Sequence, residues 1–346
     1  MFGRSKKLAE IEARLSDLDS SIRQLSQTVE AAATKPRGIE LLKSLGVTPE
    51  RFLERYFHGA PYGALYAAMN GGSESLRGRP EILGLKSGIC RQLHFSTDEF
   101  RYWAGAIGGT PTMHRKQWEY FYVIQALYER GMLAPGKKGL GFAVGREPLP
   151  ALFAKWGSEI LATDLGEEEA TAIGWVQTGQ HSNEVDHLFH ENICPRETFF
   201  SAVQYRNLNM NDIPAELSGQ FDFCWSSCAF EHLGSLEQGL IFVERSIDTL
   251  VPGGVAVHTT EFNLSSNDDT METPALSIFR RRDMEELVTR LTGAGHEVSP
   301  FDWAAGPGLA ERVVDLPPYR TTMHLKLQVE KYECTSVGII VRKKAA

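Results

Sequence analysis

The sequence predicts an α/β protein with a parallel sheet and helices on both of its faces, and residues 137–164 (KKGLGFAVGREPLPALFAKWGSEILATD) carry most of that prediction. Gly139–Val144 is a short apolar run bounded by glycines, which is typical of a buried parallel strand. Gly145 permits a tight turn, and the helix after it places apolar side chains three and four residues apart, at Leu149, Leu152, Phe153 and Trp156. A second strand ends at Asp164, so the segment reads as strand, turn, helix and strand.

Gly145 and Asp164 both stand where a predicted strand ends. In a doubly wound sheet, ligands bind in the crevice at the carboxyl ends of the strands. We therefore expect the two residues to meet over one nucleotide. The turn would lie beside its polar tail, and the acid would accept hydrogen bonds from its ribose hydroxyls.

The composition is that of an ordinary soluble protein, with 346 residues, 42% hydrophobic and 23% charged. A net charge of −8 argues against a general nucleic-acid binder, and no apolar run is long enough for a membrane span. The charged N-terminus lacks the apolar core of a signal peptide, so a cytoplasmic location is expected. The cysteines are few, odd in number and dispersed, which favours reduced thiols: Cys90, Cys194, Cys224, Cys228 and Cys334.

Residues 1–35 predict a coiled-coil helix that joins copies of the chain into a homo-oligomer. Apolar residues alternate at spacings of three and four, at Leu8, Ile11, Leu15, Leu18, Ile22, Leu25 and Val29. Basic residues flank this seam at g positions and acidic residues at e positions, so parallel partner helices would pair opposite charges. The alternative is one amphipathic helix packed on its own domain.

Residues 36–111 are expected to form a mainly helical accessory region, and residues 112–346 the catalytic domain. Within the accessory region, residues 59–87 read as a loop and Ser96 as the cap of a helix. Residues 112–130 form the longest predicted helix, with Trp118 and Phe121 on one face. These aromatic residues are interpreted as helical core, and lining of a substrate pocket is the alternative.

The alternation of strands and helices continues after Asp164. Strands are expected at 201–206, 221–226 and 255–260, helices at 236–250 and 279–295, and a final antiparallel edge pair at 298–301 and 336–342. The segment 165–195 is rich in histidine, and His187 and His190 have a spacing that metals use. No second compact pair of ligands follows, so loop residues are favoured over a metal site.

Taken together, the motifs from about residue 112 to 342 resemble those of class I S-adenosylmethionine-dependent methyltransferases. They occur in the family's order: the turn Gly141–Gly145, Asp164, the run 209–214 (NMNDIP), the strand 221–226 with Phe230-Glu231-His232, and Pro252-Gly253-Gly254. The runs GREPLPALFA, ATDL, WSSCAFEHLG and HTTEFN look like a bacterial subgroup with unassigned substrate. The resemblance implies a Rossmann-like seven-stranded methyltransferase sheet and S-adenosyl-L-methionine as cofactor.

The resemblance also implies which residues hold the cofactor. Gly141 and Gly145 would form the turn, although Ala143 replaces the family's middle glycine and the acid that usually precedes the turn is absent. Either Arg146 would pair with the methionine carboxylate or Glu147 with its amino group. The remaining positions are Asp164 on the ribose, Asn209 on the adenine amino group, the Met210 backbone N–H on a ring nitrogen, and Trp225 and Ser226 beside the methionine tail.

A hydroxyl acceptor also requires a base, and the candidates stand at the ends of the fourth and fifth strands: His232, Glu261, His258 and Glu231. His232 and Glu261 are favoured. His258 falls inside a strand and is open to a core role, and the alternative for Glu231-His232 is a structural one, capping the helix that follows. Asp315–Tyr319 and His324 are expected to add a late loop over the acceptor.

The sequence therefore predicts an S-adenosylmethionine-dependent methyltransferase, with O-methylation of a sugar or surface-glycan-related polar acceptor as the favoured reaction. The alternatives are a small-molecule N- or O-methyltransferase of specialised metabolism and a catalytically silent scaffold with the same fold. A nicotinamide-dependent oxidoreductase is disfavoured because G-x-G-x-x-G is absent.

Deleting residues 1–35 should lower the oligomeric state without unfolding the remaining chain, because the apolar seam lies wholly within the deleted helix. Light scattering on the full and the shortened chain measures this, and an unchanged number of copies per particle would refute the coiled coil.

Overall fold

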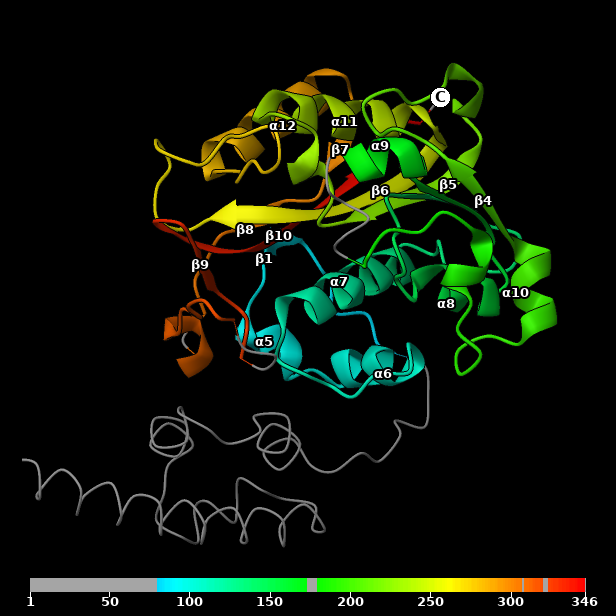
Figure 1. The fold of residues 1–346 in the computed structure, drawn as a ribbon, viewed down its shortest axis with the longest axis horizontal. Helices are drawn as coiled ribbons and strands as arrows, with labels where there is room; N and C mark the ends of the chain where they lie inside the picture. Colours follow the sequence, from blue (N-terminus) through cyan, green and yellow to red (C-terminus); the bar gives the residue numbers. More distant parts are fainter. Residues whose placement is uncertain (1–79, 173–178, 307, 320–322, 346) are drawn as a thin grey trace, which may run out of the picture.

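The computed structural model describes residues 80–172, 179–306, 308–319 and 323–345, and Figure 1 shows the resulting ribbon. The predicted coiled coil of residues 1–35 and residues 36–79 of the accessory region lie outside the described residues. Both assignments, and the division of the chain at residue 111, therefore stay predictions. No helix among the described residues is long and apolar enough to cross a membrane.

The strands form one mixed sheet in the order β4-β3-β2-β5-β6-β10-β1-β8, with β7 and β9 also paired to β10. Their bounds are β1 Ser87–Ile89, β2 Lys138–Phe142, β3 Glu159–Asp164, β4 Val203–Asn207, β5 Phe221–Ser227, β6 Leu250–Asn263, β7 Glu297–Val298, β8 Phe301–Asp302, β9 Leu327–Val329 and β10 Tyr332–Arg342.

Strands β4, β3, β2, β5 and β6 are neighbours in the sheet and run parallel, so their carboxyl ends share one edge of the sheet. The chain starts at β2 in the middle, moves outward to β3 and β4, and then returns to β5 on the other side of β2. Strand order thus reverses between β2 and β5, where Gly141 is paired with Trp225. A crevice for ligands is expected above this switch point.

The helices cover both faces of the sheet, as predicted. Figure 1 shows α11 and α12 on one side, with α5, α6, α7 and α8 on the other. Their bounds are α5 Gln92–Phe95, α6 Asp98–Ala106, α7 Arg115–Glu129, α8 Leu149–Lys155, α9 Glu167–Ala172, α10 Arg196–Ala202, α11 Leu236–Asp248 and α12 Arg281–Gly293, with short 3-10 turns at Val185–Leu188, Ala215–Leu217, Phe230–His232 and Leu309–Arg312.

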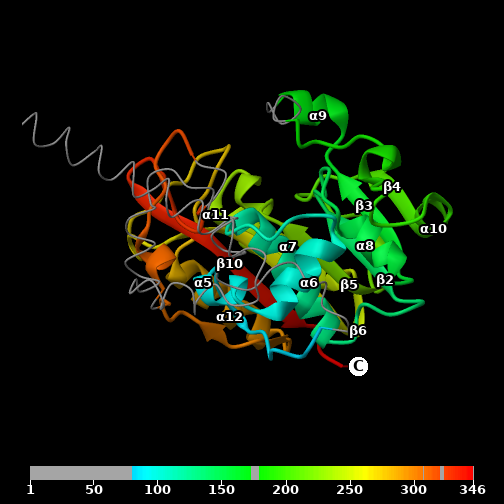
Figure 2. The ribbon, with the colours of Figure 1, turned by 90° about the horizontal axis from the view of Figure 1, so that it is seen from below.

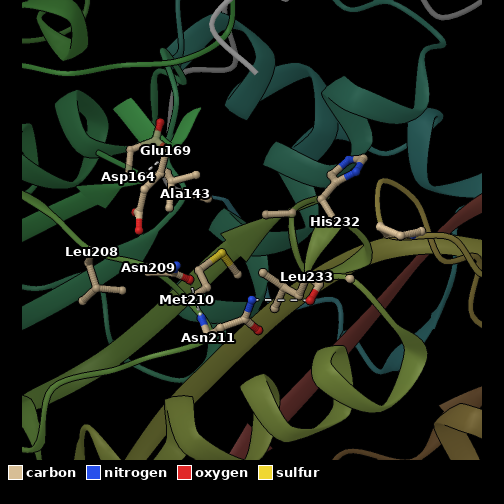
Figure 3. Close-up of a pocket in the computed structure, with 13 residues that line it drawn as sticks. Ala143, Asp164, Glu169, Leu208, Asn209, Met210, Asn211, His232 and Leu233 are labelled. Atoms are coloured by element: carbon tan, nitrogen blue, oxygen red, sulfur yellow. Dashed lines mark hydrogen bonds between the residues drawn. The ribbon is translucent and has the colours of Figure 1, made fainter. Parts of the chain in front are cut away.

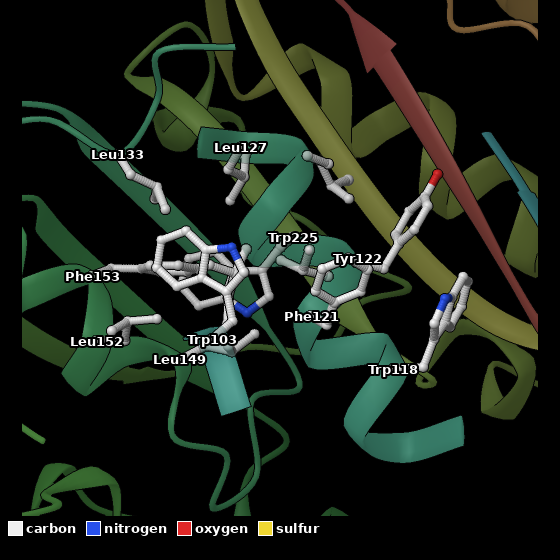
Figure 4. Close-up of a cluster of buried hydrophobic side chains, with 14 of the residues drawn as sticks. Trp103, Trp118, Phe121, Tyr122, Leu127, Leu133, Leu149, Leu152, Phe153 and Trp225 are labelled. Carbon is white, nitrogen blue, oxygen red and sulfur yellow. The ribbon is translucent and has the colours of Figure 1, made fainter. Parts of the chain in front are cut away.

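Side chains alternate along the strands, and they pack into two separate hydrophobic cores, one on each face of the sheet. On β5, Phe223 and Trp225 join the aromatic core under α6, α7 and α8, which Figure 4 shows around Trp103, Trp118 and Phe153. Cys224, between them, joins the core under α11 and α12. The helix predicted at 112–130 is therefore core-forming, as favoured, and it lies across β5, β6 and β10 (Figure 2).

Each of the seven predicted strands has a counterpart, but the sheet holds ten strands, so the count of seven is not confirmed. The additional strands β1, β8 and β9 have two or three residues each, too few to show a period in the sequence. Because β1 pairs with β10 on the side away from β6, β10 lies inside the sheet, and the predicted edge position is wrong.

Two local predictions also need correction. Thr97, not Ser96, caps α6, since its side chain accepts a hydrogen bond from the Phe100 N–H. Pro252-Gly253-Gly254 lies within β6 rather than before it, because β6 already pairs with Phe221 at Leu250 and shifts register afterwards. All five cysteines are free thiols, as expected.

Gly338→Ala should destabilise the protein by about 1–3 kcal/mol through overpacking. A Cβ at this β10 position would overlap the ring of Tyr122 on α7, which is fully buried. Gly105→Ala on α6 is the matched control, since nothing lies within 4 Å of its added Cβ. Urea unfolding of both variants measures the difference, and equal stabilities would contradict the packing of α7 on β10.

Candidate functional site

A cavity of about 430 Å³ opens at the carboxyl ends of the parallel strands, next to the switch point between β2 and β5. Figure 3 shows Asp164 and Ala143 on one wall and Asn209 and Met210 on another, with His232 beside them. Its lining residues are Ala143, Asp164, Leu165, Glu169, Leu208, Asn209, Met210, Asn211, Ala229, His232, Leu233, Gly234 and Pro274. The volume falls within the range of roughly 300–1,000 Å³ that small-molecule sites occupy.

Asp164 ends β3 inside this cavity, with 1% of its surface exposed. Its Oδ2 accepts hydrogen bonds from the N–H groups of Gly145 (3.1 Å) and Ser182 (3.2 Å), and its Oδ1 accepts one from Leu165 (2.8 Å). Burial raises the pKa of the carboxyl, and the three backbone N–H groups oppose this rise. The carboxylate is thus fixed in place, with acceptor capacity remaining toward the cavity.

The turn after β2 combines two left-handed residues. Gly145 has φ +53°, and a Cβ there would lie 2.6 Å from the Gln180 carbonyl oxygen, so only glycine fits. Ala143 adopts φ +47°, a conformation that L-residues usually avoid. The alanine therefore takes the backbone shape that glycine would take at the same position, and the turn keeps its form despite the sequence departure.

Glu147 lies beneath this turn as a buried carboxyl group. Its Oε1 accepts a hydrogen bond of 2.6 Å from the Trp225 indole N–H. Burial raises the pKa of Glu147 to about 8, although Trp225 and Ser227 oppose this. Gly141 permits the arrangement, because a Cβ there would lie 2.5 Å from the Trp225 ring. An acid in this state is poised to pair with a cation.

Arg146 takes a different direction from Glu147. Its Nε donates to the His181 carbonyl oxygen at 3.2 Å, which turns the guanidinium toward the loop after residue 179. His187 forms an ion-pair contact of 3.2 Å with Glu184, and no cluster of three potential metal ligands forms around it among the described residues.

The loop after β4 supplies the opposite wall. Leu208 and Met210 are buried and present apolar surface, and the Asn209 side-chain oxygen accepts a hydrogen bond from the Asn211 N–H (2.9 Å). This local bond holds Asn209 in a tight turn at the cavity. The predicted set Asp164, Asn209 and Met210 is therefore brought together.

Of the predicted site residues, Asp164, Asn209, Met210 and His232 line the cavity. The others are not among its lining residues: Gly141, Gly145, Arg146, Glu147, Trp225, Ser226, Glu231, His258 and Glu261. His258 is fully buried between Ser226 Oγ (2.8 Å) and Ser246 Oγ (2.9 Å), and burial lowers its pKa to about 3. The Ser226 side chain points to the same core, and Trp225 packs against Phe153 and Phe223. His258 is thus not a base in the site, and Trp225 acts only through Glu147.

His232 and Glu231 differ in position although they are neighbours. His232 lines the cavity, with Nδ1 2.7 Å from the Ala275 carbonyl oxygen. Glu231 is 1% exposed, and its Oε2 accepts a hydrogen bond from Thr260 Oγ1 at 2.9 Å.

A second polar cluster lies on the α7 side of the same sheet edge, and we call it the α7 cluster: Arg115, Lys116, Glu119, Cys228, Glu261 and Ser336. Arg115 Nη1 is 2.6 Å from Glu261 Oε2 and 3.3 Å from Glu119 Oε1, and Lys116 Nζ is 2.9 Å from Glu119 Oε2. Burial raises the pKa of Glu261, and Arg115 opposes this rise. Cys228 precedes Ala229, which lines the cavity, so the two sites adjoin.

The sequence reasoning found Glu261 but missed its partners on α7. The run RKQWE contains a signal: two cations precede an acid by three and four residues on a helix whose buried residues are mostly apolar, and Glu119 is fully buried. Charged side chains are rarely fully buried unless they are paired. Charged residues on one face of a helix that packs in the core therefore indicate a buried polar site.

Cys228, Glu231 and Glu261 have ligand atoms within 4.8 Å of one another, which is close enough for a metal ion. However, Arg115 Nη1 lies 2.6 Å from Glu261 and 3.5 Å from the Cys228 sulfur, so a guanidinium already occupies the space beside these two groups. A divalent cation beside this guanidinium would be repelled. The donor set fits the arginine better than a metal.

No family model matches the chain, and no curated protein matches it. Similar solved structures include the CurJ carbon methyltransferase, with 13% identity and a TM-score of 0.36 over 67% of this chain and 54% of that one. This chain thus spans about half the length of that protein. A putative sarcosine dimethylglycine methyltransferase from Galdieria sulphuraria has 14% identity and a TM-score of 0.39, covering 67% of this chain and 85% of that one.

A magnesium protoporphyrin IX methyltransferase from Synechocystis PCC 6803 with bound S-adenosylhomocysteine (SAH) is also similar, at 12% identity and a TM-score of 0.37 over 73% of this chain and 98% of that one. These similarities are too distant to carry a functional argument. Function must therefore come from the chain's own site.

Glu147→Gln should stabilise the protein increasingly as the pH rises. The folded chain holds the Glu147 proton up to a pKa of about 8, whereas the ordinary value is 4.5, so wild-type stability falls between these pH values. We expect a gain of about 4 kcal/mol near pH 8 and little at pH 4.5, since each pKa unit corresponds to about 1.4 kcal/mol. Urea unfolding across this range checks it, with Glu168→Gln on the exposed face of α9 as control. A gain independent of pH would contradict the buried acid.

Proposed function

We propose that this protein is an S-adenosylmethionine-dependent methyltransferase. The observation that carries the proposal is the cavity at the switch point, where the buried Asp164 carboxylate and the Asn209-Met210 loop line one space of about 430 Å³. An acid at the end of the second parallel strand and a polar turn after the next strand suit the ribose and the base of one nucleoside.

The adenosine half fits the chain's own groups. Asp164 keeps acceptor capacity for ribose hydroxyls, because three backbone N–H groups hold the carboxylate without filling its four lone-pair sites. Leu208 and Met210 offer apolar surface to the base, and Asn209 Oδ1 keeps one lone pair for an exocyclic amino group. The resemblance of the motifs to class I methyltransferases assigns the same roles.

The methionine half fits the turn after β2. Glu147 is a buried acid with a raised pKa, and an ammonium group placed beside it would draw out its proton and pair with the carboxylate. Arg146 is less suited, since its guanidinium bonds the His181 carbonyl oxygen. We therefore assign the amino group to Glu147.

When bound, S-adenosylmethionine supplies a methyl group on a positively charged sulfur. The chain's residues need only hold the donor, exclude water and orient the acceptor, because methyl transfer depends mainly on in-line geometry. The α7 cluster adjoins the cavity through Cys228 and Ala229, so it supplies the polar walls beside the reacting end.

We propose a polar acceptor that presents a hydroxyl, such as a sugar or a surface-glycan-related molecule. The support is the group of charged side chains in the α7 cluster next to the cavity, where Arg115, Glu119 and Glu261 lie together. A small-molecule N- or O-methyltransferase of specialised metabolism is the alternative. A silent scaffold is less favoured, since Ala143 keeps the glycine-like conformation that the turn needs. We also propose that copies of this protein self-associate through residues 1–35.

Asp164→Asn should weaken SAH binding by about 10- to 100-fold, because it removes a charged acceptor worth roughly 1.5–3 kcal/mol per hydrogen bond. Isothermal titration calorimetry of the full chain measures the Kd, and circular dichroism checks that the variant is folded. Glu168→Gln, which is exposed on α9 and outside the cavity, should leave the Kd unchanged. Equal affinities of wild type and Asp164→Asn for SAH would contradict the assignment of Asp164 to the ribose hydroxyls.

A further inference from the structure

His324 and Asp315 form a buried dyad that the proposed donor site does not use. His324 Nδ1 lies 2.7 Å from Asp315 Oδ2, and the two side chains are 6% and 2% exposed. Backbone hydrogen bonds fix the acid on both sides, from the Asp315 N–H to the Lys326 oxygen and from the Gln328 N–H to the Asp315 oxygen, both 2.9 Å. The acid is therefore held rigidly against the ring.

The dyad sets the tautomer of the imidazole. A carboxylate beside Nδ1 keeps the proton of the neutral ring on that nitrogen and leaves the lone pair on Nε2. No hydrogen bond from a described residue occupies Nε2. Burial lowers the pKa of His324, and Asp315 opposes this, so the ring is neutral and able to accept a proton at pH 7.

The dyad is anchored to the N-terminal end of α7. The His324 ring stacks on the His114 ring, with 4.6 Å between the ring centroids. The backbone carbonyl oxygen of His324 accepts a hydrogen bond of 2.9 Å from the Arg115 N–H. Tyr319 packs its ring edge on His324 at 5.4 Å. The titratable groups that face His324 are thus His114, Arg115 and Glu119 from α7, and Asp315 and Tyr319 from its own segment.

Arg115 connects the dyad to the donor cavity. Its backbone bonds His324, while its guanidinium contacts Glu261 and the Cys228 sulfur, and Cys228 is followed by Ala229 in the cavity wall. The dyad and the cavity therefore flank the α7 cluster from two sides.

We infer that a hydroxyl-bearing acceptor binds over the α7 cluster and that His324 Nε2 takes the proton of the reacting hydroxyl, with Asp315 as the positioning residue. This inference rests on the proposed function and deepens it by naming the acceptor chemistry. A neutral amine already offers a lone pair, whereas a hydroxyl needs a base at neutral pH.

Glu261 is less suited to this role although it lies in the same cluster. Its Oε2 is bound by Arg115 at 2.6 Å, and protonating it would remove the nearer of the two carboxylates that neutralise this buried guanidinium. His324 gains a proton beside Asp315, so its charged form is compensated.

The hydroxyl proton moves to His324 Nε2, the oxygen lone pair forms the new bond to the methyl carbon, and the electron pair of the broken carbon–sulfur bond stays on sulfur. The products are a methyl ether, SAH and an imidazolium, which returns its proton to water.

The deciding measurement is the reaction rate of each histidine with diethyl pyrocarbonate, read by peptide mass spectrometry on the full chain near pH 7. This reagent attacks neutral imidazole nitrogen. We expect His324 to be modified and to react about tenfold more slowly in Asp315→Asn, where the tautomer is no longer held. His296, which is remote in sequence and paired with the Lys344 N–H, serves as internal reference. An unreactive His324, or an equal rate in Asp315→Asn, would overturn the inference.

A second measurement links the dyad to transfer. SAH release is followed with methyl α-D-glucopyranoside and phenol as hydroxyl probes. His324→Gln should lower transfer to a hydroxyl probe at least about 100-fold. Its Kd for SAH should stay within about twofold of wild type, because His324 is not in the cavity wall. His296→Gln is the matched control and should keep full transfer. Undiminished hydroxyl transfer by His324→Gln would refute the base, whereas lack of SAH binding by wild type would refute the donor site instead.

Discussion

The site depends on one buried carboxylate. Asp164 accepts hydrogen bonds from backbone N–H groups of three segments: Gly145 in the turn after β2, Leu165 directly after its own strand, and Ser182 in a later loop. These bonds join the glycine turn to the neighbouring strand and fix the cavity wall from both sides. Without the acid, three backbone N–H donors, one of them fully buried, would lose their acceptor, so the position is structural and ligand-facing at once.

Burial also explains how charge is distributed around this carboxylate. Glu147 accepts a hydrogen bond from an indole N–H, no cation among the described residues is bonded to it, and burial raises its pKa. In the α7 cluster, by contrast, Arg115 and Lys116 compensate Glu119 and Glu261 at 2.6–3.3 Å. The two regions adjoin but differ in charge balance. The Glu147 carboxyl suits an incoming cation, whereas the α7 cluster is already neutralised and suits a polar, uncharged acceptor.

Much of the fold could be predicted from the sequence, because the parallel strands are apolar runs that end in glycine turns or acids. Gly145 and Asp164 were predicted from this pattern, whereas Asn209 and Met210 were expected only from the resemblance to class I methyltransferases. His258 and Ser226 were misplaced since a strand pattern alone does not say which face meets α11. Arg115, Glu119 and the His324–Asp315 pair were missed as partners, because their contacts join segments about 145–220 residues apart or depend on a loop without periodicity.

The central claim is that the cavity at the switch point binds the nucleoside of S-adenosylmethionine. Isothermal titration of the full chain with SAH and, separately, with NADH tests it most directly. The site's acid, its polar turn and the missing G-x-G-x-x-G predict one molecule of SAH bound per chain and no heat from NADH. Absence of SAH binding at high micromolar concentration, or binding of NADH in its place, would contradict it.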